Sequence, residues 1–211
     1  MGAVPALARI EPRLLGTAAV GGLLGGLVMF FVMAGYNASA GMGFLTILNV
    51  CFAAWVFRGT AMPATHGMGM RHETVGMHHH AMGTATMMNE PLSASHVIVG
   101  GLMHLAMSAF AGVAFAVVLA VLIRAGLRWL ATPAGYVAAA AAGGALLYVV
   151  MLYGFAPLWN TEIVNFTPRV PFFLSHLLFG AAVGGWVYWR LGEVRAGIPV
   201  QARQPRLGSA H

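Results

Sequence analysis

Four long runs of apolar residues alternate along the chain with more polar connections. The runs cover residues 14–35, 97–123, 134–156 and 172–189, and none of them contains Lys, Arg, Asp or Glu. A helix of about 20 apolar residues spans the hydrocarbon core of a bilayer. The pattern therefore predicts an all-α protein with a single membrane domain, residues 1–211, in which four transmembrane helices pack as a bundle.

A fifth apolar stretch, residues 44–57, is shorter and carries two polar side chains, Thr46 and Asn49. The arginines indicate whether it crosses, because the cytoplasmic flanks of membrane proteins collect positive charge. If it does not cross, eight of the eleven arginines share one side; if it crosses, they split five against six. We therefore predict a short re-entrant or interfacial helix at 44–57 and an extracytoplasmic connection at 58–95. Both termini, with a tail at 190–211, are predicted to lie on the cytoplasmic side of the cytoplasmic membrane.

The composition narrows the class of protein. Hydrophobic residues make up 59% of the chain and charged residues 8%, whereas a soluble domain is about 25% charged. The arginines lie at the ends of the apolar runs and form no basic face for nucleic acid, and the absence of soluble-enzyme motifs disfavours an enzyme. The predicted partner is the lipid bilayer. The sequence leaves open whether other membrane subunits or a second copy of the chain join it.

The two halves of the chain share a pattern. The segments from His104 to Gly112 and from His176 to Gly184 both read His-Leu-x-x-small-Ala-x-x-Gly. The first and third runs also align, so that Gly25-Gly26 matches Gly143-Gly144 and Met33 matches Met151. The alignment predicts a parallel repeat of one helical hairpin, with halves related by a pseudo-two-fold axis along the membrane normal. The alternative is a chance match, because small apolar residues dominate the chain. Small residues let helices approach closely in lipid, so we expect helix packing at Gly25, Gly26, Gly112, Gly180 and Gly184.

Histidine and methionine are unusually abundant, with 9 His and 14 Met. Many of them lie in the predicted connection 58–95, which shows no apolar periodicity. Thioether sulfur favours Cu(I), and imidazole suits copper as well as zinc and nickel. The connection is therefore predicted to capture copper, the alternative being a flexible loop that binds metals only adventitiously. Its candidate ligands are His66, Met68, Met70, His72, Met77, His78, His79, His80, Met82, Met87 and Met88.

A second group of histidines and methionines lies within the apolar runs, in the half nearest this connection. Ionisable residues inside membrane helices are costly and usually face the bundle interior. Three interpretations are open: a copper site fed by the loop, neutral histidines hydrogen-bonded across the bundle, or a b-type haem clamped by His104 and His176. The haem would need Ser108 and Gly180 to leave room for the macrocycle. We favour copper, with candidate ligands His96, His104, His176, Met33, Met103, Met107 and Met151.

Three short motifs carry a family resemblance. They are the glycine-rich first run with Met29 and Met33, the Gly100-x-x-x-His104 segment, and the last run from Pro171 to Gly180. Together they resemble a group of small, uncharacterised prokaryotic four-helix membrane proteins over residues 14–190. The resemblance implies an integral membrane protein with no assigned chemistry, to which the His/Met-rich connection looks like an addition. That connection is also similar in kind to the Met-rich segment of high-affinity copper transporters, which have three spans in a different order and are not kin.

These observations predict a copper-handling integral membrane protein with an extracytoplasmic His/Met loop above an intramembrane His/Met site. Two alternatives are open. In the first, the chain is an accessory subunit of a larger respiratory or redox membrane complex, with or without a bis-histidine haem b. In the second, it is a purely structural membrane protein.

Overall fold

A computed structural model of the chain describes residues 6–41, 43–45, 48, 94–159, 164 and 167–196. Every element in this part is helical, and no strand occurs in it, so the all-α prediction is confirmed. The elements are η1 (Ala6–Ala8), α1 (Pro12–Ser39), α4 (Ala94–Arg124), η2 (Arg128–Ala131), α5 (Pro133–Val149), the π-helical η3 (Val150–Phe155), α6 (Ala156–Trp159) and α8 (Arg169–Ala196).

Four of these helical stretches are long and apolar enough to cross a membrane: Pro12–Ser39, Val97–Arg124, Pro133–Leu158 and Arg169–Leu191. They coincide with the four predicted runs and indicate a multi-pass membrane protein. Of the predicted short helix 44–57, only residues 44, 45 and 48 belong to the described part. There Phe44 packs edge-on against Phe30 of α1, with ring centroids 5.6 Å apart.

The first helix of each predicted hairpin begins at a proline. Pro12 starts α1 directly after Glu11, whose backbone is extended (φ −120°, ψ 157°). Pro133 starts α5 in the same way, and the Thr132 hydroxyl oxygen accepts a hydrogen bond from the Gly135 N–H at 3.1 Å. Proline suits the first turn of a helix because its missing N–H would have no partner there. These caps set where the two helices begin.

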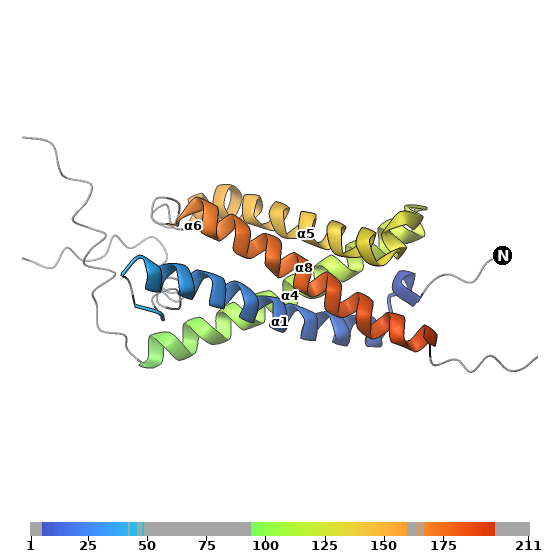
Figure 1. Cartoon of the computed structure of the whole chain (residues 1–211), viewed down its shortest axis with the longest axis horizontal. Helices are drawn as coiled ribbons and strands as arrows, with labels where there is room; N and C mark the ends of the chain where they lie inside the picture. The colour runs from blue at the N-terminus through green and yellow to red at the C-terminus, as the bar shows by residue number, and fades with distance from the viewer. Residues whose placement is uncertain are drawn as a thin grey trace, which may run out of the picture.

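The four long helices pack in the order α4, α1, α8, α5 (Figure 1). The helix α1 lies against both α4 and α8, and α8 also lies against α5, whereas α4 and α5 approach each other much less closely. The start of α1 and the end of α8 lie at the same end of the bundle, which we call the terminal end. The opposite end, where α4 and α8 begin, is the distal end.

Glycines line the close helix contacts. On α1, Gly26 faces α4, and a β-carbon added there would lie 2.5 Å from the Ser108 hydroxyl oxygen. Gly25 faces α8, and on α5 Gly144 lies directly against the backbone carbonyl of His176. Because these positions lack side chains, the helices come close enough for packing to hold them together in lipid. The same contacts contain the other glycines expected to pack: Gly112, Gly180 and Gly184.

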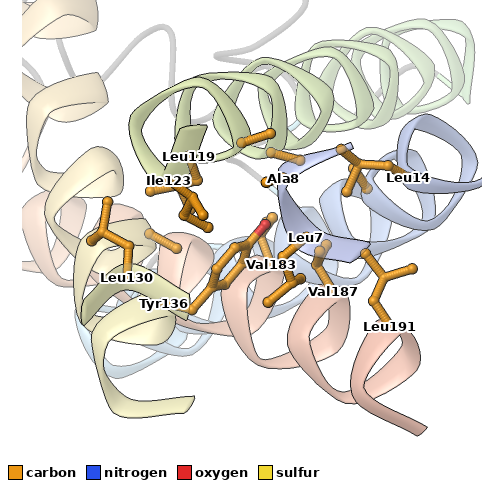
Figure 2. Packing of buried hydrophobic residues seen from close by; sticks show 14 of the residues in the cluster. Leu7, Ala8, Leu14, Leu119, Ile123, Leu130, Tyr136, Val183, Val187 and Leu191 are labelled. Carbon is orange, nitrogen blue, oxygen red and sulfur yellow. The ribbon is translucent and has the colours of Figure 1, made fainter. Parts of the chain in front are cut away.

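Apolar side chains from all four helices fill the terminal end of the bundle (Figure 2). The short helix η1 adds Leu7 and Ala8, which are buried and belong to the same cluster. Its contacts with α4 and α8 place it across this end. The described residues thus close the terminal end with a packed apolar layer.

Tyr136, on α5, brings a buried hydroxyl into this layer. Its side chain is 1% exposed, it points into the apolar cluster, and its hydroxyl has no hydrogen-bond partner in the described part of the chain (Figure 2). A buried polar group without a partner costs free energy. We expect Tyr136→Phe to raise the free energy of unfolding by about 1 kcal/mol. Thermal unfolding in detergent tests this, and a lower midpoint would show that the hydroxyl has a partner.

Candidate functional site

His104 lies in the distal half of α4, ten residues after the start of the helix, and faces α1. Its ring Nε2 lies 2.9 Å from the backbone carbonyl oxygen of Gly26. A carbonyl oxygen only accepts, so Nε2 must carry the hydrogen, and this fixes the neutral tautomer with a lone pair on Nδ1. The Ser108 hydroxyl, one turn further along, donates to the His104 carbonyl at 2.7 Å. The imidazole is thus held between two helices in one orientation.

His176 lies in the distal half of α8 and is 2% exposed. Its Nδ1 donates to the carbonyl oxygen of Phe172 at 2.8 Å, which leaves the lone pair on Nε2. The ring packs edge-on against Phe172, with centroids 4.3 Å apart, and against Tyr148 of α5 at 6.0 Å. Aromatic rings therefore shield this imidazole from two neighbouring directions.

The two imidazoles lie at a similar level of the bundle, because His104 contacts Gly26 of α1 and Phe179, one turn from His176 on α8, contacts Gly25. They are within electrostatic range of each other. Both are fixed by a hydrogen bond to a backbone carbonyl, and neither of the remaining ring nitrogens is hydrogen-bonded to another described residue. Metal-binding histidines usually show this arrangement, in which one N–H donates to a carbonyl and the other nitrogen ligates. The pair therefore offers two neutral nitrogen donors, Nδ1 of His104 and Nε2 of His176.

The candidate thioethers differ in their surroundings. Met33 of α1 is 2% exposed, whereas Met107 of α4 is 39% exposed. Met103 of α4 and Met151 in η3 are half-buried. Met33 lies seven residues beyond Gly26 along α1, about 10 Å further toward the distal end. Buried Met33 and half-buried Met103 and Met151 are thus better placed than Met107 to face the bundle interior.

The other predicted ligands lie outside this description. The backbone of His96 belongs to the first turn of α4, but its side chain lies outside the described residues. All the candidate His and Met ligands of the predicted connection 58–95 also lie outside the described residues, as does the tail beyond residue 196. Within the described part, no group of three or more His, Cys, Asp or Glu side chains gathers. Among the described residues, the soft donors left for an ion bound by both imidazoles are thioethers.

Ser108 and Gly180, the residues expected to leave room for a haem, lie in helix contacts instead. Ser108 packs against Gly26, and Gly180 lies directly against the backbone carbonyl of Ala140. The Nε2 atom of His104, the usual haem ligand, is engaged by Gly26. These contacts disfavour the haem clamp.

Buried polar side chains lie on the distal side of an aromatic pair in the middle of the bundle, and apolar side chains lie on its terminal side. The buried polar side chains of the described residues, apart from Tyr136, are Asn37, Ser108, Ser175 and His176, all toward the distal end. On the terminal side, Phe115 and Phe179 pack edge-on with centroids 5.9 Å apart, and the apolar cluster continues below them. The buried polar side chains and the apolar cluster are therefore separated by this aromatic pair.

Sequence reasoning did not single out two residues of the distal half of the bundle. Asn37 is buried on α1, one turn beyond Met33. Tyr148 contacts the His176 ring and packs edge-on against Tyr153 in the π-helical segment, with ring centroids 6.2 Å apart. Asn37 follows Met33 by four residues, and this spacing indicates that both lie on the same face of α1. The role of Tyr148 depends on the register between α5 and α8, which no local pattern reveals.

Comparison with protein families, curated proteins and solved structures found no match to this chain.

Proposed function

We propose that this integral membrane protein handles copper, holding it at an intramembrane site formed by His104 and His176. The carrying observation is that two imidazoles at a similar level of the bundle are each oriented by a hydrogen bond from a ring N–H to a backbone carbonyl, with the other nitrogen free of described partners. Orienting a ligand in this way is what outer-shell hydrogen bonds do in metal sites. Imidazole together with thioether is a donor set that suits copper.

The predicted His/Met-rich connection supports this proposal. Its ligands belong to the same two residue types as those of the intramembrane site, and it joins α1 to α4 at the distal end. We propose that it captures copper outside the cell membrane and passes it to the imidazole pair. Storage, sensing or delivery to a partner fits this arrangement better than permeation, because the described terminal half is packed with apolar side chains.

Matched helix contacts support a repeated hairpin. A β-carbon at Gly112 would lie 2.7 Å from the α-carbon of Gly22, and one at Gly184 would lie 2.6 Å from the β-carbon of Ala140. In the alignment of the two halves, Gly22 corresponds to Ala140 and Gly112 to Gly184. The pair α1 and α4 thus packs in the register of α5 and α8. On this proposal the two site histidines are equivalent residues, one from each hairpin.

Metal analysis of the full-length protein tests the copper proposal. The protein is purified from cells grown with added copper, and bound metals are measured for the wild type, His104→Ala and His176→Ala. We expect each variant to lose one copper per chain while copper held by the loop remains. Ser175→Ala is the matched control, because Ser175 is buried beside His176 and only donates to the Phe172 carbonyl.

Three outcomes would contradict the proposal. One is equal copper content in the wild type and both histidine variants, and another is a wild type that retains no copper. The third is a Soret absorbance band that disappears in either histidine variant, which would assign the pair to haem instead. Size-exclusion chromatography and circular dichroism confirm that each variant is folded.

A further inference from the structure

We infer that the His104–His176 site selects a monovalent soft ion, Cu(I), and rejects divalent ions. The inference rests on the proposed function and adds the charge and oxidation state of the metal. It follows from the charge of the spans, from the number of fixed donors and from the protonation of the two rings.

The membrane-spanning helices contain no acidic side chain. The chain has no Asp, and its five glutamates, residues 11, 73, 90, 162 and 193, all fall outside the four spans. The cost of moving an ion out of water rises with the square of its charge, so a divalent ion pays about four times as much as a monovalent one. Because the spans contain no carboxylate, the two positive charges of a divalent ion would have no negative partner in the bundle.

The two imidazoles supply no negative charge either. Each ring N–H is held by a carbonyl, His104 by that of Gly26 and His176 by that of Phe172. Deprotonation to imidazolate would therefore break the bond that orients the ring. Both donors stay neutral, and the charge of the occupied site equals the charge of the ion.

The donor count favours the same ion. Two imidazole nitrogens are fixed, and the described residues bring no third His, Cys, Asp or Glu to them. Zn(II) usually takes four ligands, whereas Cu(I) accepts two or three and tolerates neutral thioethers. The rings of Phe172 and Tyr148 against His176 hinder water from supplying the missing ligands of a divalent ion.

Titration of the purified full-length protein with several ions tests this selectivity. Ag(I) in chloride-free buffer matches Cu(I) in charge and softness without redox chemistry, and Cu(I) is added anaerobically with ascorbate. Zn(II) and Cu(II) are the divalent probes, and bound metal is measured after dialysis. We expect His104→Ala and His176→Ala each to lose one equivalent of Ag(I) and of Cu(I). Their Zn(II) and Cu(II) stoichiometries should equal those of the wild type and of the Ser175→Ala control.

The substitution His176→Met separates loss of the site from loss of folding. A thioether is a neutral, soft donor of similar size, so His176→Met should retain the Ag(I) equivalent that His176→Ala loses. Loss of one equivalent of Zn(II) or Cu(II) in either alanine variant would overturn the selectivity and leave the proposed copper site standing. Failure of every ion to distinguish the wild type from the alanine variants would overturn both proposals.

Discussion

Replacing Gly144 with alanine is expected to lower the free energy of unfolding by about 2 kcal/mol. A β-carbon at this position would meet the backbone carbonyl of His176 and approach the backbone nitrogen of Gly180 at 3.2 Å. Both atoms belong to the main chain of α8, so no side-chain rotation relieves the clash. The helices α5 and α8 must separate, and the contacts along their interface weaken. For a chain of this size, the midpoint of thermal unfolding should fall by roughly 4–8 °C.

Gly143 provides the matched control on the same turn of α5. A β-carbon there would lie 3.5 Å from the ring of Phe115, which is ordinary van der Waals contact. Alanine also has a higher helix propensity than glycine, by about 1 kcal/mol. Gly143→Ala should therefore be neutral or stabilising in the detergent in which Gly144→Ala unfolds early. Equal midpoints for the two variants would show that α5 and α8 do not pack at Gly144.

The four membrane-length helices were predictable because a bilayer imposes its own length scale. A run of about 20 residues without charge has few soluble interpretations, and glycine-rich stretches indicate close helix contacts. The helix ends extend past the apolar runs because residues such as Glu11 and Thr132 cap them without being apolar. Features of this kind can be predicted from the sequence because they depend only on residues close together along the chain.

The partners of those helices were not predictable in the same way. Gly25 and Gly26 are adjacent in the sequence, yet Gly25 contacts α8 and Gly26 contacts α4. The glycine pattern indicates that something approaches closely but does not identify the helix that does so. The same limit applies to the site. Placing His104 and His176 in one half of the bundle follows from the topology, whereas the carbonyl that orients each ring depends on the register between helices.

Phe179→Ala is expected to cost about 3 kcal/mol of stability, because it removes a ring buried in the centre of the bundle. Phe179 is 2% exposed, packs against Phe115, and lies over Gly25 of α1. It also separates the histidine site from the apolar terminal half. The measurement is thermal unfolding in detergent. A small loss would mean that neighbouring side chains collapse into the space or that the ring is not buried.

A double-mutant cycle at the same contact tests whether α1 and α8 meet at Gly25. A β-carbon at Gly25 would lie 2.8 Å from a ring carbon of Phe179, so Gly25→Ala alone should destabilise the bundle. Because Phe179→Leu shortens the side chain that clashes, the double variant should be about 1 kcal/mol more stable than the sum of the two single changes. The corresponding cycle of Gly143→Ala with Phe115→Leu should be additive, since that contact is already 3.5 Å. Additivity in both cycles would place Gly25 away from Phe179 and contradict the packing of α1 on α8 that brings the two histidines into one bundle.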